Sequence, residues 1–309
     1  MAGGMLLTMV GLVISFLSGS ESAPCASYTV VVDVTSTADV HNLTEALACT
    51  GGGAFDITWY PSVAITQRIE VSNKKNVTVT GNDFPTIRGV LPDDNETDTT
   101  VPVGSGTGTG TGVFSVSNGS ILRLNGLALE GGNAENGGAV DVLSSSSLFV
   151  FDCTFSANNA NNGGAISSLE STIYVSDNNW FADNSAVNGG AIYLDSKSSI
   201  QVDGNTSFFH NHAEENGGAV YASTNSSIGI IGDGTFSTNS AGLNGGALYA
   251  SNGSSVDMNG DNEFYLNSAV DNGGAIYLYG NSSMQIEGST SFMSNTAENH
   301  GASTTTWLG

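Results

Sequence analysis

Positively charged side chains are almost absent from this sequence. It contains 6 Lys and Arg against 29 Asp and Glu, which gives a formal net charge of −23 at pH 7. After Arg123, Lys197 is the only cationic side chain of this kind. Because phosphate binding requires clustered cations, the composition excludes nucleic acid as a partner. Anionic lipid headgroups and polyuronates are also repelled at long range. Cations, neutral glycans and basic protein surfaces suit this chain better.

Long apolar runs are missing beyond the first residues. Residues 5–17 form an apolar stretch that is too short to span a bilayer and is followed by small residues. We therefore predict a signal peptide over residues 1–22, although residues 1–4 lack a basic side chain, and a buried first strand is the alternative. The prediction is a secreted or cell-surface protein, in the outer membrane if bacterial, with no transmembrane span in the mature chain.

Cysteine is also scarce, with 3 residues in the chain. Cys25 and Cys49 bracket a predicted N-terminal cap, and they can form a disulfide in an oxidising compartment. Cys153 is then left over, and we expect it to be a small core residue.

The sequence does contain a strong internal repeat. Asn-Gly-Gly-Ala followed by Val, Ile or Leu recurs every 26 to 28 residues, and Phe-x-x-Asn-x-Ala precedes the later copies in phase. The first motif begins at residues 136, 162, 188, 216, 244 and 272, and the second at residues 155, 181, 208, 236, 264 and 292.

The segments between the motifs are typical of β-strands. Ile200 and Val202 alternate with polar residues, as do Ile173 and Val175, and turn residues separate such pairs. Three short strands per coil of about 26–28 residues predict one all-β, right-handed parallel β-helix over residues 23–309. We expect internal ladders of Phe and aliphatic residues, stacked corner Asn amides, and Gly-Gly supplying unusual dihedral angles.

The predicted organisation has several parts. An N-terminal cap covers residues 25–55 and includes a short amphipathic capping helix at residues 38–49. The first coils occupy residues 56–91, and a polar, Gly- and Thr-rich segment at residues 92–112 predicts a flexible loop. Repeat coils fill residues 113–309. The sequence stops in mid-coil, which predicts a truncated C-terminus or a cover from elsewhere.

The repeat, with its Gly-Gly-Ala-Ile and Phe-x-x-Asn motifs, resembles the chlamydial polymorphic outer-membrane-protein repeat over roughly residues 113–302. Similar repeats lie within the pectin-lyase-like right-handed β-helix superfamily. The resemblance implies surface display and adhesion, here as a non-catalytic adhesion, glycan-contact or matrix surface. We expect no C-terminal outer-membrane barrel in this sequence, which sets it apart from the bacterial proteins that it resembles.

The alternative is a carbohydrate-active enzyme of that superfamily: a polysaccharide lyase, hydrolase or epimerase. A uronate lyase requires a base and cations, and a hydrolase requires a carboxylate pair. Arg68, Arg88 and Arg123 lie on early coils and can share a face. The carboxylates recur at equivalent turn positions, whereas a catalytic pair should break the repeat. We therefore favour a non-enzymatic role with no catalytic residues.

Two rows of side chains are candidate binding sites. Tyrosines follow Gly-Gly-Ala-Ile/Val/Leu, and alternation turns them outward, where they can contact glycans or cover neighbouring strands; they are Tyr193, Tyr221, Tyr249 and Tyr277. Carboxylates a coil apart in the turns can bind Ca²⁺, the one cofactor considered, or remain solvated; they are Asp177, Asp203, Asp233, Asp261 and Glu287.

Candidate N-glycosylation sites in a eukaryotic secretory pathway follow the Asn-x-Ser/Thr pattern. They are Asn42, Asn76, Asn95, Asn118, Asn205, Asn225, Asn252 and Asn281. Partners are predicted to be a polysaccharide or a cell-surface protein.

Overall fold

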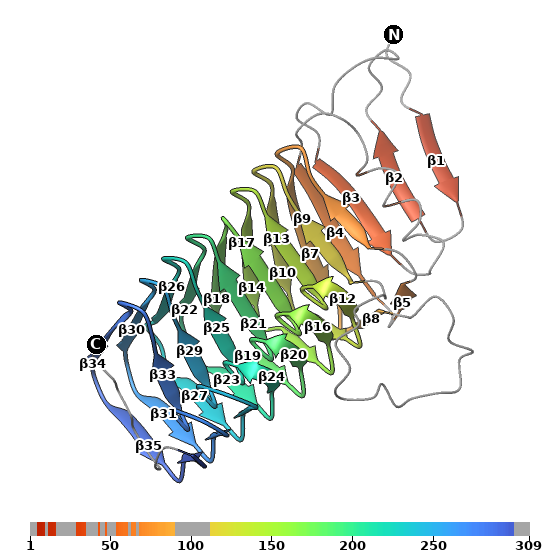
Figure 1. Cartoon of the computed structure of the whole chain (residues 1–309). Helices are drawn as coiled ribbons and strands as arrows, with labels where there is room; N and C mark the ends of the chain where they lie inside the picture. The colour runs from red at the N-terminus through yellow and green to blue at the C-terminus, as the bar shows by residue number, and fades with distance from the viewer. Residues whose placement is uncertain are drawn as a thin grey trace.

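The repeat builds a parallel β-solenoid whose coils follow one another along one axis (Figure 1). The computed structural model describes residues 5–9, 12–16, 29–34, 43, 47, 54–60, 63–65, 68–89 and 112–299. Over these residues the strands of successive coils pair in register into four parallel sheets of ten, nine, seven and eight strands. The right-handed sense expected for parallel crossover connections stays a prediction.

One coil illustrates the path of the chain. It runs from β14 (Ser147–Phe151) through β15 (Thr154–Ser156), β16 (Asn159–Asn162) and β17 (Ile166–Leu169), and then returns to the first sheet at β18 (Thr172–Ser176).

From residue 121 onward the prediction of three strands per coil is therefore wrong, because each complete coil there has a fourth, whereas the coil that begins at residue 54 has the three predicted strands. The extra segment lies between the Phe corner and the Gly-Gly pair. Within it, Ala160 stacks in register on Ala134 and Ala186 and is fully buried. A single buried Ala is too weak a pattern to predict a strand from sequence.

The first two sheets carry the outer surfaces discussed below. The ten-stranded sheet contains β3 (Thr29–Val34), β4 (Ala54–Trp59), β7 (Asn76–Gly81), β10 (Ile121–Asn125), β14, β18, β22 (Ser199–Val202), β26 (Ser227–Ile230), β30 (Ser255–Asn259) and β34 (Ser283–Glu287). The nine-stranded sheet contains β5 (Val63–Ile65), β8 (Thr86–Gly89), β11 (Ala128–Glu130), β15, β19 (Asn179–Ala182), β23 (Thr206–Phe209), β27 (Gly234–Ser237), β31 (Asn262–Tyr265) and β35 (Thr290–Met293).

The other two parallel sheets flank the Gly-Gly turns. The seven-stranded sheet contains β12 (Asn133–Asn136), β16, β20 (Ser185–Asn188), β24 (His212–Asn216), β28 (Ser240–Ala241), β32 (Ser268–Ala269) and β36 (Thr296–Ala297). The eight-stranded sheet contains β6 (Ile69–Val71), β9 (Phe114–Val116), β13 (Val140–Leu143), β17, β21 (Ile192–Asp195), β25 (Val220–Ala222), β29 (Leu248–Ala250) and β33 (Ile276–Leu278).

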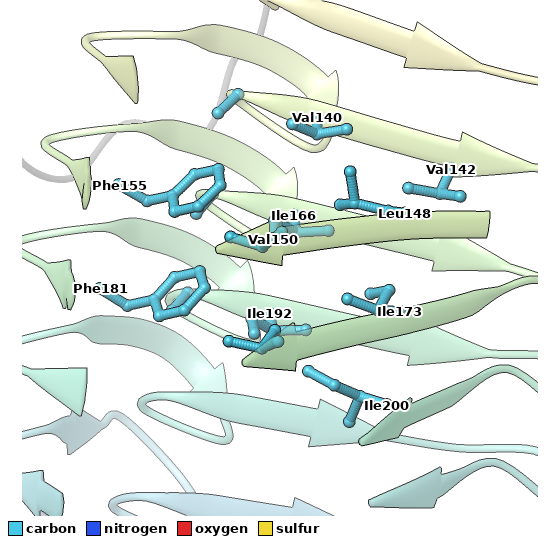
Figure 2. Packing of buried hydrophobic residues seen from close by; sticks show 14 of the residues in the cluster. Val140, Val142, Leu148, Val150, Phe155, Ile166, Ile173, Phe181, Ile192 and Ile200 are labelled. Carbon is cyan, nitrogen blue, oxygen red and sulfur yellow. The ribbon is translucent and has the colours of Figure 1, made fainter. Parts of the chain in front are cut away.

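The core consists of the expected ladders of identical or similar side chains. Phe155 stacks on Phe181 with ring centroids 4.8 Å apart, and the same stack continues through Phe208, Phe236, Phe264 and Phe292. Figure 2 shows Phe155 and Phe181 on consecutive coils, opposite the aliphatic ladders that include Ile166 and Ile192. The predicted ladders are confirmed.

A ladder of buried asparagines runs beside the Phe stack, as predicted. Each amide donates to a carbonyl in the preceding coil and, except for that of the last member Asn295, to the Oδ1 of the Asn in the next coil, as Asn211 does to the Phe181 carbonyl and to Asn239. Its members are Asn158, Asn184, Asn211, Asn239, Asn267 and Asn295, and each is at most 2 % exposed.

The two glycines of each Gly-Gly pair are required for different reasons. The first glycine has positive φ in every described copy, for example 68° at Gly217. The second has ordinary φ, but a Cβ at Gly218 would lie 2.1 Å from the Gly246 carbonyl oxygen of the next coil. Contact between coils, and not backbone dihedral angle, therefore requires glycine at the second position.

The N-terminal part is described only in pieces. β1 (Met5–Met9) and β2 (Leu12–Phe16) form an antiparallel pair within the predicted signal peptide, which stays a prediction. The capping helix falls almost entirely outside the described residues, although Leu43 and Leu47 within it are buried. The predicted loop at residues 92–112 also lies outside them, apart from Gly112.

Candidate ligand-binding face on the ten-stranded sheet

One outward-facing column of the ten-stranded sheet changes its residue at almost every coil. The members of this column occupy equivalent positions near the middle of their strands, because the strands of successive coils pair in register. The columns on either side of it hold Leu, Ile, Val or Met in every one of these coils, and these side chains are buried up to β30. The members, in coil order, are Arg123, Phe149, Tyr174, Gln201, Gly229, Asp257 and Gln285. Conserved packing inside therefore coexists with a non-repeating outer surface.

The early end of this column is a closed aromatic stack. Phe149 stacks on Tyr174 with ring centroids 4.7 Å apart and planes 13° apart. The Arg123 guanidinium lies 4.9 Å from the centroid of the Phe149 ring, and it also donates to Asn76 Oδ1. Phe149 is thus covered on both faces. Tyr174 has no aromatic ring in the next coil, where Gln201 takes that position.

Beyond Tyr174 the sheet is hollowed into a groove of about 510 Å³. Gly229 lies in its middle and contributes no side chain, and a Cβ there would meet only the Ile200 carbonyl oxygen, at 3.6 Å. The groove crosses β18, β22, β26, β30 and β34, and it is lined by Thr172, Tyr174, Ser199, Ile200, Gln201, Ser227, Gly229, Ile230, Ile231, Asp257, Met258, Asn259, Gln285 and Glu287.

The groove lining offers hydrogen bonds but no positive charge. Its charged members are the exposed carboxylates Asp257 and Glu287, and the amide of Gln285 donates to Glu287 Oε1 at 2.5 Å. Amides, hydroxyls and carboxylates side by side can pair with the hydroxyl groups of a ligand. The apolar contacts come from the Tyr174 ring and from Ile231, which is 46 % exposed. This combination suits an uncharged polar ligand with apolar faces.

The tyrosine row lies on the eight-stranded sheet, in register from coil to coil. Tyr193 and Tyr221 stack with centroids 5.0 Å and planes 2° apart, and the stack continues through Tyr249 to Tyr277. Each ring is half-buried, and burial raises the pKa of Tyr193 and of Tyr249 above the ordinary value. Because the rings cover one another, the interior of the row has no open face for a sugar. This geometry favours the role of covering neighbouring strands.

The turn carboxylates do not share one register. Since Val202 pairs with Ile230 and Met258 with Ile286, Asp203 and Glu287 fall in a column that also holds Ile231 and Asn259. Asp233 and Asp261 lie two positions further on, where the Asp261 backbone N–H donates to Asp233 Oδ1 at 3.1 Å. Among the residues that the structure describes, no group of three His, Cys, Asp or Glu side chains is placed to hold a metal ion. This geometry does not support the predicted Ca²⁺ site, of which Asp177 is also a member. The prediction of Ca²⁺ binding stays untested.

The three arginines lie on three different sheets. Arg68 borders the eight-stranded sheet, with Nη1 3.7 Å from Asp141 Oδ2; Arg88 on the nine-stranded sheet pairs with Glu130 at 2.9 Å; and Arg123 lies on the ten-stranded sheet. Burial raises the pKa of Asp141 to about 6, against the opposing effect of Arg68. The expectation that these arginines can share a face is therefore wrong, because consecutive strands of a coil belong to different sheets.

Cys153 is a core residue, as predicted. It is 1 % exposed, its Sγ lies 3.1 Å from the Phe151 carbonyl oxygen, and burial raises the pKa of the thiol to about 12. The predicted disulfide partners, Cys25 and Cys49, lie outside the described residues.

The described sequon asparagines are all exposed, as a glycosylation site requires. They are Asn76, Asn118, Asn205, Asn225, Asn252 and Asn281. Asn42 and Asn95 fall outside the described residues. Glycosylation of these sites stays a prediction.

The groove residues were not predicted from the sequence. Tyr174, Gln201 and Asp257 each look like ordinary outward residues of a strand. One signal was available in the sequence. When the coils are aligned with each other, one outward position of the strand in the ten-stranded sheet varies from coil to coil. That comparison separates Gly229 from its neighbours, because other coils have a side chain there.

Comparison with known proteins supports the nature of the repeat. Residues 205–223 and 233–251 match the family described as the Chlamydia polymorphic membrane protein repeat. No curated protein matches the chain. Among solved structures, the chain is similar to the L. reuteri 53608 SRRP, with 10 % sequence identity and a TM-score of 0.49 over 84 % of this chain and 98 % of that one. Within the described residues, no helix is long and apolar enough to cross a membrane. The chain is thus a parallel β-solenoid in which two segments match the Chlamydia polymorphic membrane protein repeat.

Proposed function

We propose that the chain is a non-catalytic extracellular or cell-surface β-solenoid that binds a polysaccharide along the groove of the ten-stranded sheet. The observation that carries the proposal is the groove itself, a hollow bounded by Tyr174 and centred on Gly229 in the outer surface of the sheet. The apolar residues 5–17 and the polymorphic-membrane-protein repeat support an extracellular location.

The shape of the groove favours an extended ligand that lies across the strands. It reaches from β18 to β34, which are four strand intervals apart in the sheet order. At a strand spacing of about 4.8 Å this gives a length of roughly 19 Å, enough for several sugar rings in a row. The open face of Tyr174 can stack on the apolar face of a ring at one end of the chain. Gln201, Asp257 and Gln285 can then bind the hydroxyl groups of the following rings.

The charge of the groove favours a neutral polysaccharide. Asp257 and Glu287 are exposed in the lining, and no Lys or Arg is among the lining residues. Arg123 is one coil before Phe149, and Phe149 and Asn76 already contact its guanidinium. A polyuronate would therefore meet repulsion without compensation.

Filling the groove is expected to abolish binding. The Gly229→Gln substitution places a side chain like that of Gln201 in the hollow, and the fold tolerates it because Gly229 does not have positive φ and the added Cβ has room. Binding to the neutral polysaccharide selected by the native protein on a glycan array is expected to weaken at least about tenfold, equivalent to about 1.4 kcal/mol. Calorimetric titration measures the change.

A matched control introduces the same side chain on another face. Thr235→Gln lies on the outer face of β27 in the nine-stranded sheet, and it is expected to bind like the native protein. Equal binding by Gly229→Gln and the native protein would place the ligand elsewhere. Release of reducing sugar or unsaturated uronate from the bound polysaccharide would instead favour the enzyme alternative.

A further inference from the structure

A pair of exposed aromatic rings interrupts the outer face of the nine-stranded sheet. Trp180 on β19 is 45 % exposed, and Phe209 on β23 is 38 % exposed. In the columns of these two residues the neighbouring coils carry small side chains: Thr154 and Ser207 flank Trp180, while Ala182 and Ser237 flank Phe209. We call Trp180 and Phe209 the aromatic platform. No ring in either column directly covers the platform.

The geometry of the platform differs from that of the ring stacks. The Phe ladder and the Tyr193–Tyr221 pair are nearly parallel stacks in which neighbouring rings cover each other. Trp180 and Phe209 are instead tilted by 38°, with centroids 5.9 Å apart, and belong to different columns. The platform therefore keeps apolar surface exposed, and a ligand that covers this surface gains the free energy of its burial.

Hydrogen-bonding side chains border the platform on two sides. Beyond Phe209, His210 Nδ1 lies 2.6 Å from Asp183 Oδ1, and both side chains are more than half exposed. Before Trp180, the backbone N–H and side-chain amide of Asn178 each donate to Asp152 Oδ1 at 3.2 Å. These carboxylates and the imidazole have further hydrogen-bonding capacity toward solvent.

We propose that the aromatic platform is a second carbohydrate site, independent of the groove, and that it binds a neutral pyranose ring. The ring stacks one apolar face on Trp180 and Phe209, and its hydroxyl groups bond with Asp183, His210 and Asp152. The platform spans two neighbouring coils, so it fits one or two sugar rings and not a long chain. The two flanking carboxylates, together with the net charge of −23, disfavour an anionic sugar.

Tryptophan fluorescence tests this proposal directly. Trp59 is fully buried, and replacing Trp307 by Phe removes the remaining background, so Trp180 becomes the tryptophan that responds to solvent. The full chain is titrated with neutral gluco-, galacto-, manno- and xylo-oligosaccharides. At least one is expected to shift the emission to shorter wavelength as it covers Trp180. Trp180→Thr is expected to abolish that shift, and both Trp180→Thr and Phe209→Ser to weaken binding measured by calorimetry at least about tenfold.

The controls separate this site from the groove. Trp180→Thr and Phe209→Ser introduce residue types that the same columns already hold in neighbouring coils, so both variants are expected to fold. Tyr265→Ser, in the Phe209 column but two coils further along, and Gly229→Gln should both leave the shift unchanged. The proposal is overturned if no oligosaccharide moves the emission, if Trp180→Thr and Phe209→Ser bind like the native protein, or if Gly229→Gln removes the shift.

Discussion

Gly218→Ala is expected to lower the melting temperature by at least about 10 °C, because no space exists for a methyl group at this position. The added Cβ would lie 2.1 Å from the Gly246 carbonyl oxygen and 2.7 Å from that of Ser240. Both atoms belong to the backbone of the next coil. The Gly218 backbone N–H also donates a hydrogen bond to the Gly245 carbonyl of that coil. Relief of the contact requires the two coils to separate, with loss of hydrogen bonds on either side.

Gly229→Ala is the matched control for this prediction. Its Cβ would contact the Ile200 carbonyl oxygen at 3.6 Å, an ordinary van der Waals distance. Thermal unfolding followed by circular dichroism should place the control within about 2 °C of the native protein, as for other surface substitutions. A melting temperature of Gly218→Ala equally close to native would contradict the coil contact as the reason for the second glycine.

The second large effect is expected at the asparagine ladder, where Asn239→Ala should cost about 3–5 kcal/mol of unfolding free energy. Asn239 Oδ1 accepts hydrogen bonds from the Asn211 backbone N–H at 3.0 Å and from its amide at 2.9 Å, and Asn239 Nδ2 donates to the Phe208 carbonyl at 3.0 Å. Alanine removes these partners in a region that is fully buried. Water cannot replace them there, so each orphaned group retains its cost of desolvation.

A second row of asparagines provides the comparison. Asn244 donates from Nδ2 to Asn216 Oδ1 at 2.9 Å, but it is only half-buried at the Gly-Gly turn. Because water can reach this row, Asn244→Ala is expected to cost no more than about 1 kcal/mol. Equilibrium unfolding in urea measures both variants. Equal losses for Asn239→Ala and Asn244→Ala would show that burial does not distinguish the two rows.

The interior of this protein could be predicted from its sequence because the repeat marks each inward position several times. Phe181, Asn184 and Ile192 each have a counterpart at the equivalent place of the next coil, and the structure stacks each on that counterpart. The fourth strand was missed because its pattern reduces to one buried alanine, such as Ala186. The turn carboxylates were misaligned because Asp203 and Asp233 occupy different positions in turns of equal length: Val202 pairs with Ile230 before the turn and Thr206 with Gly234 after it.

The outer surface could not be predicted in the same way. Binding depends on the positions where one coil differs from the next, and a repeat analysis passes over those positions. Gly229 and Trp180 are such exceptions, one by lacking a side chain and the other by presenting a large ring among small residues. The tyrosine row attracted attention because it repeats, and its regular stacking is what closes the faces of its rings. In this solenoid, repetition accounts for the core and variation indicates the candidate sites.

Carboxyl footprinting tests the groove most directly. The native protein is labelled with a carbodiimide and an amine, with and without the neutral polysaccharide that it binds, and the modification of each carboxylate is measured by mass spectrometry. We predict that the polysaccharide protects Asp257 and Glu287 in the groove and leaves Glu215 on β24 and Asp195, close in sequence to Tyr193 on β21, equally labelled. Protection of Asp195 without protection of Asp257 and Glu287 would assign the ligand to the tyrosine row and contradict the proposed function.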